Sequence, residues 1–215
     1  MSEIITLGKK KAVIGLIAAV LMVLGGGLYV QHRKVSIGNP APAFRTKGAA
    51  APVIRITKFS DFACPACAKG SEALERLVLA YPDKVQVQFK HNPLTGIHKW
   101  SYDAALYADC AGRQGKFWEY SKLLFAGMDK WRNAGDLPAE FAAYAHESGL
   151  DSAVLNACRN DPAAAAALRG DLADGERLGI NTTPTFLVNG ERAVGVEQLA
   201  VQLRKLSPLL KEAAR

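Results

Sequence analysis

One segment organises this chain, and it reads Phe59-Ser60-Asp61-Phe62-Ala63-Cys64-Pro65-Ala66-Cys67. An apolar run typical of a β-strand, residues 53–59, leads into it, and a helical pattern follows directly. Both sulfurs are therefore expected in the first helical turn. Pro65 suits the first helical position, which places Cys64 at the helix cap beside unpaired backbone donors. A thiolate at Cys64 is stabilised there and its pKa falls, while Cys67, one turn further in, can reach back and close a disulfide.

This Cys-x-x-Cys pair is interpreted as a redox pair, with a purely structural disulfide and a metal site as the alternatives. Zinc sites usually need a second Cys or His pair at similarly short spacing. The other two cysteines, Cys110 and Cys158, are isolated, and the sequence contains no His-x₃₋₅-His. We therefore expect no metal ion and no cofactor.

Length and composition fit one globular domain with an appendage. The chain has 215 residues, of which 49% are hydrophobic and 22% charged, so it can bury a sizeable core. Its net charge is +7, but the basic residues are spread along the sequence and form no block with interleaved aromatics. We expect a dispersed solvated surface and no nucleic-acid partner.

The N-terminal region contains an uncharged apolar segment, residues 12–30, between Lys9-Lys10-Lys11 and His32-Arg33-Lys34. At about 1.5 Å per residue it would cover about 28 Å, close to the thickness of a hydrocarbon core. A cleaved signal peptide is the alternative, but this apolar core is longer than usual and no small-x-small site follows promptly. We expect a retained transmembrane anchor, with residues 1–11 in the cytoplasm.

Residues 31–51 are interpreted as a tether that could include a short strand around Phe44. Beyond the cysteines, apolar residues at helical spacing predict a helix that ends at Pro82. The alternation in residues 84–90 predicts a strand half exposed to solvent. Strand, helix and strand in this order predict a parallel βαβ unit with the Cys-x-x-Cys at the carboxyl end of its first strand, where open α/β sheets keep their sites.

The next part of the chain, residues 99–179, is predicted to be a helical subdomain inserted into this sheet. Asp151 and Asp161 are expected to cap two of its helices. Cys110 and Cys158 lie within it, and in an exported protein two remaining cysteines favour a structural disulfide; two small buried hydrophobic residues are the alternative. The chain then returns to the sheet with a strand at residues 185–188 and an Asn-Gly hairpin turn.

Three motifs together resemble the DsbA-like branch of the thioredoxin superfamily. The resemblance covers about residues 48–206 and implies a thioredoxin fold of the α/β class with an inserted helical subdomain, here placed at residues 52–206 with a tail at 207–215. It also implies thiol-disulfide exchange, and a cis peptide at Thr183-Pro184 that packs against the cysteines and binds substrate chains. The motifs are Phe59-Ser60-Asp61-Phe62 with Cys64-Pro65-Ala66-Cys67, then Lys90-His91-Asn92-Pro93-Leu94, and Thr183-Pro184-Thr185-Phe186.

Two residues beside the cysteines bear on the oxidising power. The strongest oxidases of this family carry His where this chain has Ala66, whose methyl group cannot donate a hydrogen bond to the Cys64 thiolate. Asp61 could accept a proton from Cys67, raise a thiol pKa by its charge, or serve only as a turn residue. His91 and His98 are expected to be structural groups rather than partners of the thiols.

The sequence therefore favours a periplasmic oxidase of protein thiols, anchored in the inner membrane. Cysteine-containing exported proteins would be its substrates, and by the resemblance a membrane redox partner would reoxidise it. The alternatives are a disulfide isomerase or client-specific reductase, and a non-catalytic tethered chaperone or assembly factor. The tether is too short for the extra dimerisation domain that family isomerases typically carry, which favours the oxidase.

Overall fold

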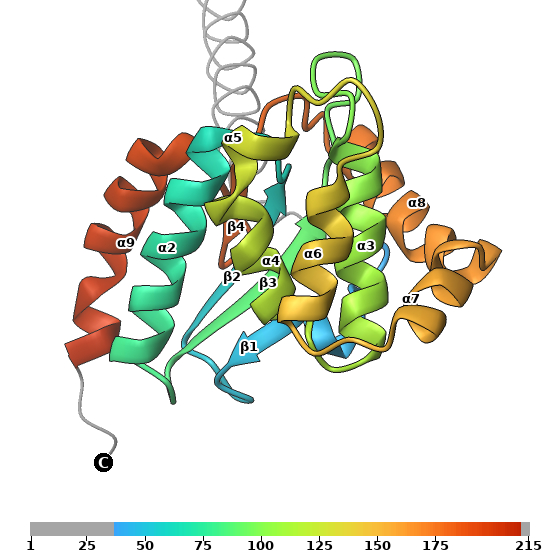
Figure 1. The fold of residues 1–215 in the computed structure, drawn as a ribbon. Helices are drawn as coiled ribbons and strands as arrows, with labels where there is room; N and C mark the ends of the chain where they lie inside the picture. The colour runs from blue at the N-terminus through green and yellow to red at the C-terminus, as the bar shows by residue number, and fades with distance from the viewer. Residues whose placement is uncertain (1–36, 212–215) are drawn as a thin grey trace, which may run out of the picture. The chain divides into compact units, whose positions relative to one another are not determined.

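A computed structural model describes residues 37–211, and its centre is a five-stranded mixed sheet (Figure 1). The strand order is β1-β3-β2-β4-β5, in which β2 and β3 are parallel and the other neighbours are antiparallel. The strands are β1 (Thr46–Gly48), β2 (Ile54–Ser60), β3 (Val85–His91), β4 (Thr185–Val188) and β5 (Glu191–Val194). The helices are η1 (Ala43–Arg45), α2 (Pro65–Ala80), α3 (Ser101–Arg113), α4 (Phe117–Ala126), α5 (Met128–Trp131), α6 (Ala139–Glu147), α7 (Ser152–Arg159), α8 (Pro162–Arg177) and α9 (Gly195–Lys211).

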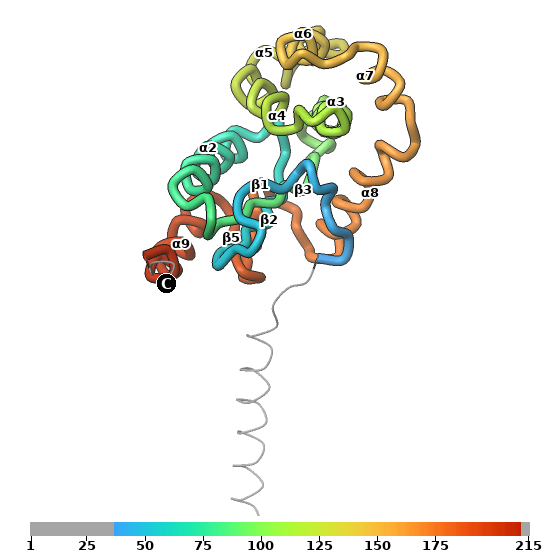
Figure 2. Tube along the Cα trace, turned by 90° about the horizontal axis from the view of Figure 1, so that it is seen from below, coloured from blue at the N-terminus to red at the C-terminus, as the bar shows by residue number. Residues whose placement is uncertain are grey.

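The elements β2, α2 and β3 form the parallel βαβ unit that the sequence predicts. Ile54 pairs with Val85 at one end of the two strands, and Ser60 pairs with His91 at the other. Helices α2 and α9 run side by side and pack against the sheet, while the inserted helices gather at the other side of α2 (Figures 1 and 2). The Cys-x-x-Cys follows the carboxyl end of β2, as predicted.

Two apolar cores stabilise this arrangement, since burial of apolar surface is the main favourable term in folding. One lies between the sheet and the helices α2 and α9, and includes Ile56, Leu74 and Leu199. The other fills the helical insertion and continues to Phe62, directly before the cysteines. The insertion is therefore packed against the turn that carries the thiols.

The local signals inside the insertion act as the sequence predicts. Asp151 and Asp161 are the N-caps of α7 and α8. The Asp151 carboxylate accepts hydrogen bonds from the backbone N–H groups of Ala153 and Val154, and the Asp161 carboxylate accepts one from that of Ala163. A disulfide joins Cys110 in α3 to Cys158 in α7. The structure thus links two helices that are 48 residues apart in sequence.

The prediction of a half-exposed β3 is wrong, because six of its seven residues are buried. This strand lies between β1 and β2, and its alternate side chains are covered on both faces of the sheet. Gln86 donates to the Ala49 carbonyl oxygen, and the Lys90 ammonium donates to the Asn39 carbonyl oxygen. Polar residues that looked solvent-facing are therefore buried with partners.

The buried partners of β3 belong to a network of charged groups that ties the insertion to the sheet. Arg45 is fully buried and forms ion pairs with Asp109 of α3 and Asp171 of α8. Lys90 pairs with Asp171, with 3.1 Å between Nζ and Oδ1, and also with Asp174 of α8. Burial of these charges is tolerated because each has a partner of opposite charge.

Both ends of the described part of the chain belong to the fold. The short first strand, β1, begins two residues after Phe44, and α9 continues to Lys211, past the start of the tail expected at residue 207. The proposed anchor at residues 12–30 lies outside the described residues. Within residues 37–211, no helix combines the length and the apolar character needed to cross a membrane.

Candidate active site

The first turn of α2 holds both thiols of the Cys-x-x-Cys. Helix α2 begins at Pro65, and Cys64 is its N-cap with an extended backbone conformation. The Cys67 N–H donates to the Cys64 carbonyl oxygen at 2.9 Å, which closes the first turn and brings Cys67 back toward the cap. The structure confirms this predicted placement of the two cysteines, and both are free thiols.

The two sulfurs have opposite electrostatic environments. The pKa of Cys64 is lowered from 9.0 to about 5, chiefly by a hydrogen bond from the Cys67 side chain, with further hydrogen bonds from the Cys67 backbone, from Thr183 and from the Ala66 backbone; burial opposes them. The pKa of Cys67 is raised well above 9.0 because this thiol is fully buried and lies beside the Cys64 thiolate. These opposite shifts favour Cys64 as the nucleophile of the pair and Cys67 as its protonated partner.

The loop before β4 meets the cysteines from the far end of the chain. The Cys64 sulfur lies 3.4 Å from the Thr183 carbonyl oxygen, across 119 residues of sequence. The Thr183-Pro184 peptide bond is cis, as the resemblance implied. A methyl group at Gly70 of α2 would come within 3.8 Å of Pro184, so the helix and this loop are close together. Both residues proposed to bind substrate thus lie beside the thiols.

Asp61 anchors the turn in front of the cysteines. Its buried carboxylate accepts hydrogen bonds from the backbone N–H groups of Ala63 and Leu94, both at 2.8 Å. It also accepts from the Ser101 hydroxyl at 2.6 Å and lies 2.8 Å from Nδ1 of His98. Of the three roles left open by the sequence, these contacts favour that of a turn residue. Asp61 contacts Cys67 through its backbone, whose N–H donates to the Cys67 sulfur at 3.5 Å.

The two histidines are held by carboxylates away from the sulfurs. His98 bonds to Asp61, and His91 is buried at the end of β3 with Nε2 2.9 Å from Oδ1 of Asp109. Burial lowers the pKa of His91, and the nearby Arg45 guanidinium lowers it further. The observed partners of the two rings are therefore carboxylates, as expected of structural groups.

Lys58 is the residue of this site that the sequence analysis missed. It lies in β2, six residues before Cys64, and is 1% exposed. Its ammonium donates to the Cys67 carbonyl oxygen at 2.8 Å and to the Ser71 hydroxyl. Burial lowers its pKa to about 8, while its electrostatic interactions with Cys67 and Cys64 act to raise it. The one sequence feature that could have indicated this buried lysine is its position inside an apolar run. A lysine on the exposed side of a half-buried strand would give the same pattern.

The lowered pKa of Cys64 gives a prediction about pH. Alkylation of the reduced protein by iodoacetamide should have a midpoint near pH 5, because only the thiolate reacts. The rate should be flat from pH 6 to about pH 8, and should fall about tenfold for each unit below the midpoint. Mass spectrometry of quenched samples would measure it. In Cys67→Ala the midpoint should rise, since the largest stabilising hydrogen bond is removed; a midpoint near 9 in the unchanged protein would contradict the assignment.

Comparison with known proteins places this site in a family. A family model described as Thioredoxin matches residues 45–205. Among solved structures, the chain resembles a thioredoxin-like oxidoreductase from Silicibacter pomeroyi DSS-3, with 27% identity, a TM-score of 0.63, and coverage of 79% of this chain and 92% of that one. It also resembles Pseudomonas aeruginosa DsbA2, with 26% identity, a TM-score of 0.64, and coverage of 82% and 100%.

One relative in sequence is named as a transporter rather than as an oxidoreductase. It is a Na(+)/H(+) antiporter NhaA 3 from Salinispora tropica, 32% identical over 142 residues, which are 66% of this chain and 21% of that protein. The chain therefore spans about a fifth of the length of this relative. The family model, by contrast, covers well over half of the chain, including both cysteines and the Thr183-Pro184 segment. The chain belongs to the DsbA-like thiol-disulfide oxidoreductases of the thioredoxin superfamily.

Proposed function

We propose that this protein oxidises the thiols of other proteins to disulfides through Cys64 and Cys67. The observation that carries the proposal is the pairing of a stabilised Cys64 thiolate at a helix cap with a buried, protonated Cys67. Stabilisation of the Cys64 thiolate favours the reduced form of the pair, and a pair that prefers to be reduced is an oxidant of other thiols. The Thr183-Pro184 segment beside Cys64 is the proposed surface for the substrate chain.

The reaction would begin with the Cys64–Cys67 disulfide. A substrate thiolate attacks the Cys64 sulfur, a mixed disulfide forms, and Cys67 leaves with the electron pair. Cys67 then takes up a proton, as its raised pKa favours. A second substrate thiolate attacks the substrate sulfur of the mixed disulfide and releases Cys64 as a thiolate. The substrate loses two electrons and the pair gains them.

The cellular setting is also part of the proposal. Residues 12–30 would anchor the chain in the inner membrane, the residues that follow, up to residue 37, would tether it, and the fold from Gly38 to Lys211 would work in the periplasm on exported proteins. A membrane redox partner would reoxidise the pair. Peptides N-terminal to Ala12 should then be recovered from the membrane fraction, whereas a soluble product that begins at residues 41–44 would indicate a cleaved signal peptide.

The redox potential tests this function. Equilibration with glutathione buffers should give a potential between about −270 mV, typical of thioredoxin, and about −120 mV, typical of DsbA. Ala66→His should raise it by roughly 30 to 65 mV, because a charge-assisted hydrogen bond to the Cys64 thiolate contributes about 1.5 to 3 kcal/mol and about 30 mV corresponds to 1.4 kcal/mol.

Two outcomes separate the alternatives, and a control variant accompanies them. A potential at or below that of thioredoxin would contradict the oxidase and favour a reductase. A pair that does not exchange with glutathione at all would favour the tethered chaperone or assembly factor. Ala66→Gln, which adds bulk without a positive charge, is the matched control for the histidine and should change the potential less.

A further inference from the structure

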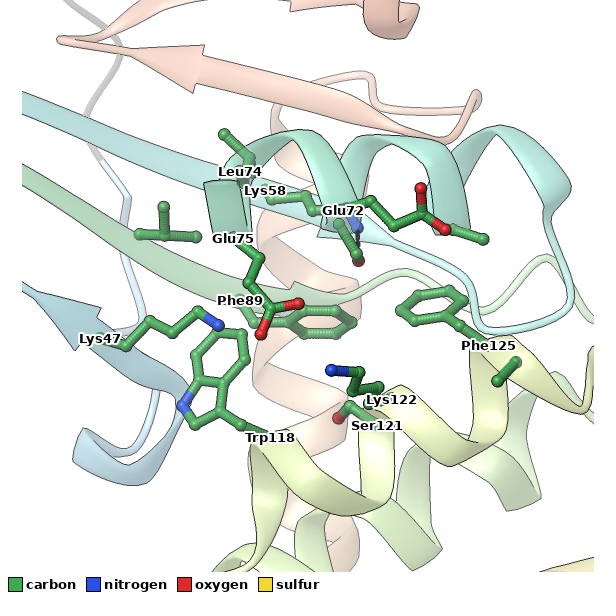
Figure 3. Close-up of a pocket in the computed structure, with 14 residues that line it drawn as sticks. Lys47, Lys58, Glu72, Leu74, Glu75, Phe89, Trp118, Ser121, Lys122 and Phe125 are labelled. Atoms are coloured by element: carbon green, nitrogen blue, oxygen red, sulfur yellow. Dashed lines mark hydrogen bonds between the residues drawn. The ribbon is translucent and has the colours of Figure 1, made fainter. Parts of the chain in front are cut away.

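A cavity of about 180 Å³ lies behind the thiols, between α2 and α4 (Figure 3). Its walls are mainly apolar, and Phe89, Trp118 and Phe125 supply aromatic surface. Lys47, Lys122, Glu72 and Glu75 also line it, and the Lys47 ammonium lies 4.3 Å from the centre of the Trp118 ring. The two glutamates offset the charges of these two lysines, so Lys58, the third lysine of the lining, leaves the cavity with a net positive charge. The Thr183-Pro184 segment proposed to bind substrate chains contributes nothing to this lining. The cavity is therefore distinct from that surface.

One wall of this cavity carries a buried positive charge, the ammonium of Lys58. The Lys58 ammonium donates to the Cys67 carbonyl oxygen and the Ser71 hydroxyl, and the rings of Phe89 and Phe125 lie 5.5 and 5.0 Å from it. Within residues 37–211, no ion pair of Lys58 with an acidic side chain occurs. An ammonium has three donors and one unit of charge. The two neutral acceptors and the two aromatic rings offset only part of the free-energy cost of burying that charge.

A second polar group in the cavity has no partner. The Ser121 side chain of α4 lines the cavity and is buried, and its hydroxyl makes no hydrogen bond to any described residue. Figure 3 shows this hydroxyl on the α4 side and the Lys58 ammonium on the α2 side, with the aromatic rings between the two helices. Buried polar groups without partners are uncommon in folded proteins, and this one lines the same cavity as the buried Lys58 ammonium.

We propose that this cavity binds a small amphipathic anion, with a flat apolar body and one carboxylate. The carboxylate would accept a hydrogen bond from the Lys58 ammonium and balance its charge, which is worth most in a buried site. The apolar body would lie among Phe89, Trp118 and Phe125. The volume suits a single substituted ring, since a cavity of about 150 Å³ is enough for benzene.

Occupancy of the cavity should depend on the redox state of the cysteines. Lys58 holds the Cys67 backbone, and its charge interacts with both sulfurs. In the reduced protein the Cys64 thiolate already supplies a negative charge near Lys58, whereas the disulfide supplies none. The anion should therefore bind the oxidised protein more tightly, and by reciprocity it should favour that form. This step rests on the proposed redox function of the pair; the cavity itself does not.

The experiment uses 3-phenylpropionate as the probe, with 3-phenylpropan-1-ol as its neutral counterpart. Binding to the oxidised full chain is measured by calorimetry, with amide chemical shifts of residues 68–75 and 118–126 to locate the site. The acid should bind at least tenfold more tightly than the alcohol. Lys58→Met should abolish this difference. Lys69→Met, which changes an exposed lysine of α2 that does not line the cavity, should alter it less than twofold.

Ser121→Leu provides a second variant that leaves Lys58 in place. It should fill the cavity and weaken binding of acid and alcohol alike, which keeps the test decisive if Lys58→Met does not fold. Equal affinity of the unchanged protein for acid and alcohol, or unchanged binding in Ser121→Leu, would overturn the proposal. Equal affinity of the oxidised and reduced proteins for the acid would overturn the redox coupling. A pair inert toward glutathione would refute the proposed function, yet the lysine-dependent binding would still be observed.

Discussion

Cys67→Ser should accumulate mixed disulfides with substrate proteins through Cys64, whereas Cys64→Ser should accumulate almost none. With a pKa near 5, Cys64 is about 99% thiolate at pH 7, while a thiol with a pKa of 9 is about 1% thiolate. Cys67 is fully buried and its pKa lies above 9.0, so it is a poorer nucleophile still. We expect the exchange rate of Cys64→Ser to fall by more than about a hundredfold. Non-reducing gels and mass spectrometry of the trapped adducts would measure both effects.

The other cysteine pair provides the control for this experiment. Replacement of both Cys110 and Cys158 by serine removes a disulfide that lies between α3 and α7, and should leave trapping by Cys67→Ser unchanged. Stability should fall, because closing a loop of this length contributes about 4 kcal/mol in the chain-entropy model. Equal trapping by Cys64→Ser and Cys67→Ser, or trapping that needs Cys110 or Cys158, would refute the assignment of Cys64.

The parts of the fold that could be predicted are those with local causes. Pro65 at the first helical position, Asp151 and Asp161 as caps, and the Asn189-Gly190 turn each act within a few residues of themselves. The parallel βαβ unit follows from the order of these local elements. The position of Cys64 at the cap of α2 was predictable for the same reason, and with it the chemistry of the site.

The partners of buried polar groups could not be predicted, because they come from distant parts of the chain. Lys90 looks like the exposed side of an amphipathic strand, but its acidic partners lie 81 and 84 residues later, in α8. Asp61 had three roles open to it until Leu94, His98 and Ser101 were found around its carboxylate. Periodicity shows the spacing of polar and apolar residues along the chain. It does not show whether another helix or strand packs over the polar side chains and buries them.

The same limit applies to Lys58 and the cavity behind the thiols. A lysine in a strand is usually solvated, so nothing in the sequence distinguishes Lys58 from Arg55, which is exposed in the same strand. Only the packing of α2 and α4 over β2 shows that Lys58 is buried beside Cys67. The burial of the Lys58 charge is therefore determined by the fold. Lys58 contacts the active site through its hydrogen bond to the Cys67 carbonyl oxygen.

Arg45→Met should cause the largest loss of stability among single substitutions outside the cysteines. The guanidinium is fully buried and pairs with Asp109 and Asp171, and Nε lies 2.6 Å from Oδ1 of Asp109. Its removal leaves the Asp109 carboxylate with His91 as its one side-chain partner among residues 37–211. Loss of one member of a buried ionic network typically costs about 3 to 5 kcal/mol, a large part of the roughly 5 to 15 kcal/mol that stabilises a domain.

Urea unfolding of the reduced and oxidised protein would measure this loss, with Arg113→Met as the matched control. Arg113 pairs with Asp161 at 3.1 Å, but both side chains are more than a third exposed, so its loss should cost at most about 1 kcal/mol. Arg45→Met should also loosen the insertion first, because Arg45 connects η1 to α3 and α8, and amide hydrogen exchange should rise in those helices before it rises in β2. If the two variants were equally stable, the buried network would contribute no more than a surface ion pair. Exchange that rose evenly through the sheet and the insertion would show that Arg45 does not hold the two together.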